Sequence, residues 1–337
     1  MTRRISKADI KRAVQDEKLK VALDRSATAY SAARSEAMAD VDFLAHQDRV
    51  REVKERSVSR LMELVELFKK EAERVGVVVY EAKDAADANA YVTRLAHERG
   101  VKLAVKSKSM LTEEIGLNAH LEASGVKVVE TDLGEWIIQL AGEKPSHFTQ
   151  PAVHKTREQV AELFSKVTGE KLYSDIPTLV NVARKQLRQA FIDADMGISG
   201  ANILIAETGT IVIVANEGND RLVTTLPPVH VAVVGYEKLV ESMDDAVEIL
   251  KLLSKSGTGQ KATAYVSFIT GPSRTTDIEK TLALGVHGPK EVHVVLVDGG
   301  RLQMLQDEKM REALYCIKCG ACLNVCPTYR SVGGHVY

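Results

Sequence analysis

The chain has 337 residues and a mass of 36.9 kDa, which allows one large α/β domain and a smaller unit. Its 45 basic and 46 acidic residues give a net charge of −1, which excludes a global attraction to nucleic acid or to an anionic membrane. No apolar run approaches the ~18–20 residues needed to cross a bilayer, and the first residues lack the apolar stretch of a signal peptide. The sequence therefore predicts a cytoplasmic protein without a membrane span, and four clustered cysteines suit that reducing compartment.

The first 75 residues are predicted to be helical. They are rich in charge and alanine, apolar residues recur at helical spacing from Leu61 to Phe68, and Gly76 follows as a stop signal. We predict two or three helices here. They are expected to pack as a layer on the domain that follows, with a partner-binding arm as the alternative.

From Val77 onward, β-branched runs alternate with helical stretches. This order predicts an α/β fold with a parallel, helix-flanked sheet. The run "GANILIAETGTIVIVAN" has Gly209 and Thr210 at its centre and predicts a hairpin. Strands are predicted in 75–83, 101–109, 126–134, 230–240, 262–273 and 291–301, and helices in 84–100, 111–125, 155–192 and 301–312.

All four cysteines lie in the run "CIKCGACLNVCP", at 316–327. The spacing Cys316-x2-Cys319-x2-Cys322-x3-Cys326-Pro is that of bacterial ferredoxins, in which closely spaced thiolates hold an iron–sulfur cluster. Zinc usually takes two separated cysteine pairs, or cysteine and histidine at finger spacing. A zinc site completed by His335 and a redox dithiol are the alternatives.

The four cysteines are too few to ligate two iron–sulfur clusters. In two-cluster ferredoxins the fourth cysteine, here Cys326, ligates the other cluster. No second cysteine run occurs in the 337 residues. Three explanations stay open for a complete site: a further segment, a partner's ligands, or the recruitment of Cys326 to a single cluster. The first cluster could also remain at three irons.

Weaker polar candidates follow the predicted strands. Glu130 and Asp132 come directly after an apolar run, where open α/β sheets bind ligands, although capping of a helix near Glu135 explains them equally. His147 and His154 stand beside prolines and could carry protons or bond to loop carbonyls.

Further candidates lie in loops. Glu207 sits in the predicted hairpin, where a turn carboxylate usually bonds to nearby amides. Arg221, in "ANEGNDR", could bind a carboxylate or phosphate through its forked donors. The basic segment "KSKS" (106–109) is either a solvated loop or an anion site, and "GISGAN" (197–202) is a weak nucleotide signal.

Several segments, together with the cysteine run, resemble the lactate-utilization iron–sulfur proteins of the LutB/LldF family. The resemblance implies a LUD domain, similar in fold to the NagB/RpiA/CoA-transferase group, an open sheet with helices on both faces. It further implies an N-terminal helical region (1–75), the LUD domain (76–300) and a partial 4Fe-4S ferredoxin-type segment (301–337). The segments that carry it are "KSKSMLTEEIGLN" (106–118), "ETDLGEWIIQLAGEKPSHFTQPAVHK" (130–155), "GISGANILIAETGTIVIVANEGNDR" (197–221), "TGPSRTTDIE" (270–279) and "GPKEVHVVLVDGGR" (288–301).

For the cofactor, the resemblance implies that Cys316, Cys319 and Cys322 ligate one [4Fe–4S] cluster and that Cys326 ligates a second. The family continues to a second cysteine run, so this chain is expected to be truncated before that run and to hold an incomplete second cluster. Family members act with two partner subunits in oxidising L-lactate to pyruvate. We therefore expect an iron–sulfur electron-transfer subunit of a lactate dehydrogenase complex.

Two other functions stay open. The LUD domain could itself be an enzyme or binding module for an organic acid or CoA-like ligand, with a structural cluster. A crevice that holds Glu130, Asp132, His147 and Arg221 together would favour it. Alternatively, the chain could be a scaffold that holds partner subunits together.

Overall fold

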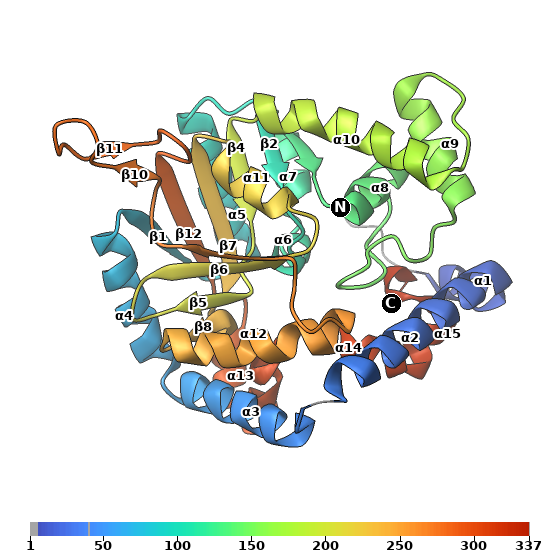
Figure 1. The fold of residues 1–337 in the computed structure, drawn as a ribbon, viewed down its shortest axis with the longest axis horizontal. Helices are drawn as coiled ribbons and strands as arrows, with labels where there is room; N and C mark the ends of the chain where they lie inside the picture. Colours follow the sequence, from blue (N-terminus) through green and yellow to red (C-terminus); the bar gives the residue numbers. More distant parts are fainter. Residues whose placement is uncertain (1–5, 40, 337) are drawn as a thin grey trace.

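The computed structural model describes residues 6–39 and 41–336, and its centre is a six-stranded parallel sheet (Figure 1). The strand order is β1-β12-β7-β4-β2-β3, and every neighbouring pair is parallel. The middle strands are nearly continuous runs of valine because both faces of the sheet are covered. The strands are β1 (Val77–Ala82), β2 (Leu103–Lys106), β3 (Lys127–Glu130), β4 (Met196–Ser199), β7 (Val229–Gly235) and β12 (Glu291–Val297).

Helices cover both faces, as expected for the fold class. One face packs on α5 (Ala85–Glu98), α6 (Met110–Glu114) and α7 (Leu117–Ala123). The other face carries α4 (Leu61–Arg74) with the second sheet, and beside them α8 (Leu133–Ala141), α9 (Arg157–Thr168) and α10 (Ile176–Asp193).

A second sheet of four strands, in the order β8-β5-β6-β9, packs on one face of the first, against β7 and β12. The predicted hairpin is confirmed, since β5 (Ile203–Ile205) pairs antiparallel with β6 (Thr210–Ala215) and Gly209 turns the chain at φ 64°. The remaining elements are α11 (Asn219–Thr225), η1 (Tyr236–Lys238), β8 (Leu239–Val240), α12 (Met243–Thr258), β9 (Tyr265–Ile269), and the short pair β10 (Arg274–Thr275) and β11 (Ala283–Leu284).

The N-terminal region differs from the prediction of two or three helices. Four helices occur among the described residues between Lys7 and Arg74, and they pack on different elements. Helices α1 (Lys7–Gln15) and α2 (Glu17–Met38) pack on the C-terminal helices, α3 (Phe43–Ser59) packs on α12, and α4 packs on β1. The region is therefore no single layer.

Two other predicted helices are each split. The helix expected over 111–125 breaks at Gly116, which adopts φ 67° between α6 and α7. The stretch expected over 155–192 ends at Gly169 (φ 74°), and α10 begins only after the Asp175 cap. Glycine in the left-handed region ends both first halves.

The C-terminal segment, which carries the cysteine run, lies beside the N-terminal helices (Figure 1). Its elements are α13 (Arg301–Gln306), η2 (Arg311–Tyr315), α14 (Ala321–Val325), α15 (Pro327–Val332) and η3 (Gly334–Val336). Among the described helices, none is both long and apolar enough to pass through a bilayer.

The packing of α4 between the sheets gives a stability prediction. Phe68 is fully buried among residues of both sheets, so Phe68→Ala should lower the free energy of unfolding by about 3–5 kcal/mol. Met62, on the same helix, is 43% exposed, and Met62→Ala should cost less than about 1 kcal/mol. Denaturant unfolding of both variants tests this, and equal losses would contradict the described burial of α4.

Candidate functional site

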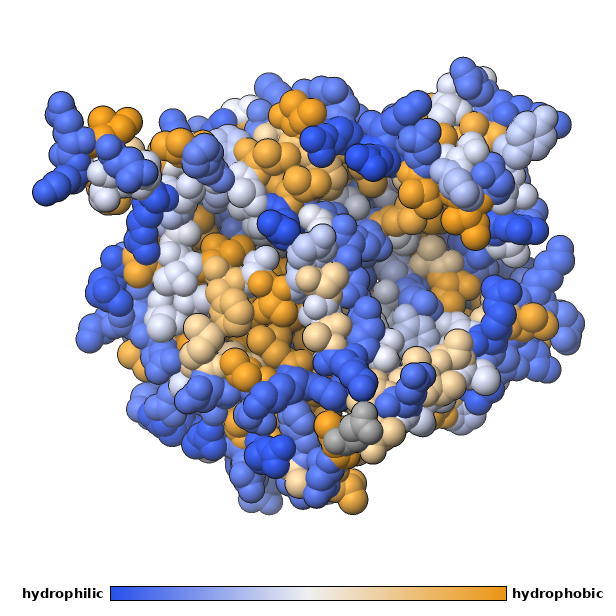
Figure 2. Space-filling view, in the orientation of Figure 1, coloured by the Kyte–Doolittle hydropathy of each residue, from blue (hydrophilic) through white to orange (hydrophobic). Residues whose placement is uncertain are grey.

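A cavity of about 450 Å³ lies at the carboxyl ends of the parallel strands. Its walls come from the segments after β2, β3, β4, β7 and β12, with further residues from β6 and α12. Figure 2 shows the surface hollowed right of centre, beside an apolar patch over β6 and β9. Open α/β sheets bind ligands at this edge, so we refer to the cavity as the crevice.

Two glycines allow the chain to pass close to the crevice wall. A Cβ atom on Gly200 would lie 2.8 Å from the Ser109 hydroxyl, and one on Gly235 would collide with the Glu237 carboxylate and the Arg301 guanidinium. A Cβ atom at either position would force the neighbouring side chain to shift. Glycine therefore allows the Ser109, Glu237 and Arg301 side chains to keep their described positions.

One wall of the crevice is acidic. Lys108 Nζ lies 3.0 Å from Asp132 Oδ2, while Asp132 Oδ1 caps α8 by accepting from the Glu135 amide. Glu217 and Asp220 stand beside this pair, and burial raises the pKa of both carboxyl groups. The single Lys108 is thus shared among three carboxyl groups, which we call the acidic wall.

The opposite end carries cations. Arg301 pairs with Glu237 (Nε to Oε2, 2.5 Å) and with Glu114. Burial alone would raise the pKa of Glu237, but the charges of the neighbouring cations lower it. Lys54 is buried on α3 and donates to the Glu237 carbonyl; burial lowers the pKa of Lys54 to about 8. Lys238 also lines the crevice.

A second charged cluster lies behind the crevice. Lys106, fully buried at the end of β2, pairs with Glu130 (2.8 Å) and with Glu113 (3.3 Å). Asn118 donates to Glu130 at 2.6 Å. Burial, followed by the charge of Glu130, raises the pKa of the neighbouring Glu135 to about 8. Glu130 thus serves as the partner of a buried lysine and does not line the crevice in the described structure.

The cysteine loop closes the crevice at its cationic end. Cys319 lines the cavity next to Lys318, and the Cys319 carbonyl approaches α12 so closely that a Cβ on Gly257 would lie 3.1 Å from it. Ile317 packs against the apolar cluster that joins α3, α12 and the second sheet. The loop is therefore fixed to the domain body on two sides.

The donor set fits an iron–sulfur cluster in part. Lys318 takes a left-handed conformation (φ 59°) and its amide donates to Cys316 Sγ at 3.4 Å, a hydrogen bond directed at a sulfur ligand. Burial raises the pKa of Cys319, and the charges of Cys316 and Cys322 add to that rise. Within residues 6–39 and 41–336, however, no three His, Cys, Asp or Glu side chains stand ready to hold a metal ion.

Cys326 lies apart from that group. It packs at the edge of an apolar cluster that includes Leu19 and Leu23 of α2 and Tyr329 of α15. Cys319 lines the crevice, whereas Cys326 lies among the N-terminal helices. The division of the four thiols between two clusters stays a prediction. The thiolates of Cys316, Cys319 and Cys322 have the chemistry that a shared cluster requires.

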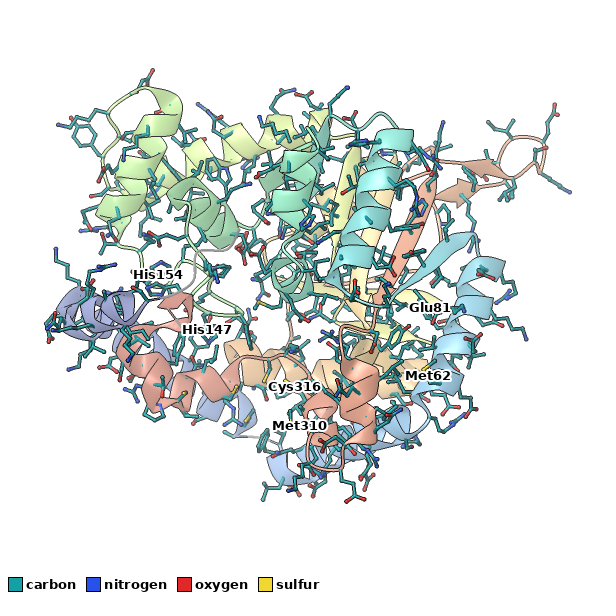
Figure 3. The ribbon with its side chains drawn as sticks, turned by 180° about the vertical axis from the view of Figure 1, so that it is seen from behind. Met62, Glu81, His147, His154, Met310 and Cys316 are labelled. Carbon is teal, nitrogen blue, oxygen red and sulfur yellow. The ribbon has the colours of Figure 1, made fainter. Side chains whose placement is uncertain are left out.

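The loop that carries His147 and His154 covers the cysteine run (Figure 3). His147 is buried, its Nδ1 accepts from the Thr149 amide at 3.1 Å, and a Cβ on Gly320 would lie 3.0 Å from its ring. Burial lowers the pKa of His147 to about 4, so the ring is neutral near pH 7.

His335 belongs to the same contact. Its ring stacks on His154 at 4.2 Å, and His154 Nε2 lies 2.8 Å from Glu143. Burial lowers the pKa of His335 to about 4. The Gly334 amide donates to the Ser146 carbonyl. These contacts attach the residues after the cysteines to the LUD-like body.

The other candidates lie outside the crevice in the described structure. Glu207 accepts from the Met243 amide at 2.8 Å and so caps the start of α12, and Arg221 stacks over the Tyr265 ring at 5.0 Å. Of the four residues expected together, only Asp132 lines the crevice. The sequence did not lead us to predict Lys54, Lys238 and Arg301 as residues of the site. Lys238 and Arg301 follow strands, and this position could have indicated them, because open α/β sheets bind ligands there.

The family model for the LUD domain matches residues 65–297. The chain belongs to the LUD domain family. The resemblance to the lactate-utilization proteins is confirmed by relatives of that name. Lactate utilization protein B of Oceanobacillus iheyensis is 45% identical over 267 residues, covering 79% of this chain and 54% of that one. Lactate utilization protein B of Geobacillus kaustophilus is 42% identical over 303 residues, 88% of this chain and 62% of that one.

A third relative is the Escherichia coli protein named uncharacterized electron transport protein YkgF, 38% identical over 88% of this chain and 62% of that one. The chain thus spans between about half and two thirds of the length of these relatives. A crystal structure of a DUF162 family protein from Deinococcus radiodurans matches 70% of the chain and 98% of its own, with a TM-score of 0.39 and 16% identity.

Burial of Glu135 predicts a pH-dependent stability. The pKa of Glu135 is raised from about 4.5 to about 8, so the native state holds its proton more tightly than the unfolded state. The free energy of unfolding should therefore fall as pH rises through this window. Glu135→Gln should remove this contribution, so that the variant gains about 2 kcal/mol relative to wild type between pH 6 and pH 8. If the free energies of unfolding of wild type and Glu135→Gln changed with pH in parallel, the raised pKa of Glu135 would be contradicted. Glu162→Gln, on an exposed face of α9, is the control and should follow wild type.

Proposed function

We propose that the chain is an iron–sulfur electron-transfer subunit of a cytoplasmic system that oxidises L-lactate to pyruvate with two partner subunits. The names of the relatives support the coarse assignment to lactate utilization and electron transport. The observation that carries the proposal is the run of Cys316, Cys319 and Cys322 beside the crevice, which Cys319 lines, with the Lys318 amide donating to Cys316 Sγ.

The residues have distinct roles in this proposal. Cys316, Cys319 and Cys322 hold the first [4Fe–4S] cluster as thiolates, and Cys326 ligates a second cluster whose other ligands lie outside these 337 residues. A bound cluster accepts and releases one electron at a time. No side chain then needs to exchange protons with lactate.

The surrounding charges favour an anionic centre. Lys54 is near Cys316 and shares the charge of Glu237 with other cations, and Lys318 adds a charge within the loop itself. Positive charge near thiolate-bound iron stabilises the reduced, more negative state. The lysines therefore favour acceptance of an electron.

The rival function, a small-molecule enzyme with a structural cluster, expected four residues in one crevice. Glu130 pairs with Lys106, His147 packs on Gly320 and Arg221 stacks on Tyr265, so this set is not assembled in the part of the chain described. A scaffold function is separated from electron transfer by experiment.

We predict different effects for two matched cysteine substitutions. After anaerobic reconstitution, Cys319→Ser should lose most of the bound iron and sulfide, because one of three closely spaced ligands is removed. Cys326→Ser should retain the first cluster, because that thiol packs among the N-terminal helices. Iron and sulfide analysis with EPR of the reduced chain measures both.

Equal iron loss in the two variants would refute the division of ligands. Binding of partner subunits by Cys319→Ser, followed by size-exclusion chromatography, tests the scaffold function. A scaffold would bind partners and keep lactate oxidation, whereas an electron carrier would bind partners and lose it.

A further inference from the structure

The molecule carries an arm that projects away from its body. The arm (274–286) contains β10 and β11, which pair with each other, and Figures 1 and 3 show it standing clear of both sheets. Its large apolar side chains, each at least 44% exposed, are Ile278, Leu282, Leu284 and Val286. A soluble monomer rarely presents so many apolar side chains on one segment, so we expect another surface to cover the arm.

The tip of the arm is strained. Glu279 and Lys280 both adopt left-handed backbone conformations, at φ 51° and 56°. The Thr281 amide donates to the Ile278 carbonyl across this turn. Turns of this shape favour glycine and asparagine, because other side chains are crowded there. Strained backbone clusters at sites of function, so the tip favours a role for the arm beyond connecting β9 to β12.

The strand that leads into the arm, β9, offers a second apolar surface. Ile269 packs between the two sheets, and side chains alternate along a strand, so Val266 and Phe268 point away from the first sheet. These two side chains are 39% and 43% exposed. Figure 2 shows an apolar patch in this region, over β6 and β9. Arm and strand therefore present two apolar surfaces that follow each other along the chain.

The strands of both surfaces also have free edges. In the described structure, β9 pairs with β6 alone, and β10 and β11 pair only with each other. A free strand edge offers backbone donors and acceptors to a strand of another molecule. The surface is therefore suited to a partner that presents strands of its own.

A second copy of the chain meets these requirements. It presents the same arm and the same strand, so each arm can pack on the other copy's β9 across a twofold axis. Residues 265–286 carry two basic and two acidic side chains, and the whole chain has a net charge of −1, so charge does not oppose self-association. The segment also matches in length the ~20 residues that each partner contributes to an interface of standard size.

We propose that residues 265–286 form the interface of a symmetric dimer in which the arm of each copy packs on β9 of the other. The two reciprocal contacts remove the exposed apolar side chains of both elements from water. The arm lies away from the C-terminal helices α14 and α15 (Figure 1), so the dimer forms with or without bound iron. This inference goes beyond the electron-transfer proposal, and the two can fail separately.

Sedimentation velocity of the full chain, with and without bound iron, tests the proposal. We expect both forms to have twice the mass of the 36.9 kDa chain and to dissociate on dilution. Leu282→Lys in the arm and Phe268→Glu on β9 should each raise the dissociation constant of the dimer at least tenfold, because each places a charge in both apolar contacts.

A mixture of these two variants tests the exchange of arms. In a mixed dimer, one contact has the wild-type residues at positions 268 and 282, and the other contact brings opposite charges together. The mixture should therefore dimerise more tightly than either variant alone. Thermal unfolding of each variant confirms that it is folded.

Ile192→Lys is the matched control, since Ile192 on α10 is 61% exposed and Leu282 is 60% exposed. It should leave the dissociation constant unchanged. The proposal is overturned if wild type is a monomer at every concentration, if its mass keeps rising beyond that of a dimer, if Leu282→Lys dimerises as wild type does, or if mixing restores nothing. A monomeric wild type that loses binding of the partner subunits in Leu282→Lys would assign the arm to those subunits and also overturn it.

Discussion

The close approach of the Cys319 carbonyl to Gly257 holds the cysteine loop against α12. A Cβ atom at position 257 would lie 3.1 Å from that carbonyl, so the loop would have to shift by a few tenths of an ångström. Ile317 fixes the same loop from the other side, against α3 and α12. Because α12 also lines the crevice, these contacts decide that the cysteines face the carboxyl edge of the parallel sheet. The N-terminal helices then complete the enclosure of the C-terminal segment.

Charge is distributed along this edge in an ordered way. The buried pair of Lys106 and Glu130 neutralises itself behind the crevice, and Lys108 is shared by the acidic wall. Lys54 and Lys238 lie near Cys316 and share the negative charge of Glu237 with Arg301. Several cations therefore gather beside the cysteine loop, where positive charge would stabilise thiolates.

Much of the architecture could be predicted from local sequence. β-branched runs located five of the six parallel strands, and Gly209 located the hairpin. The short β4, with the sequence MGIS, was missed because it has only one β-branched residue. The breaks at Gly116 and Gly169 were missed because the apolar period continues across both glycines. The assignment of the cysteines as cluster ligands rests on their spacing and stays a prediction. The crevice was not, since the strand order brings residues after β2, β3 and β7 together, and no local pattern reveals that Glu130 turns inward to Lys106 while Lys238 faces the cavity.

The most direct test of the account is anaerobic EPR of the iron-loaded chain after addition of L-lactate. With the two partner subunits present, we predict the signal of a reduced iron–sulfur cluster, and without them no signal. A chain that binds no iron, or a cluster that remains oxidised by lactate in the complete complex while lactate is still consumed, would contradict the assignment as an electron carrier.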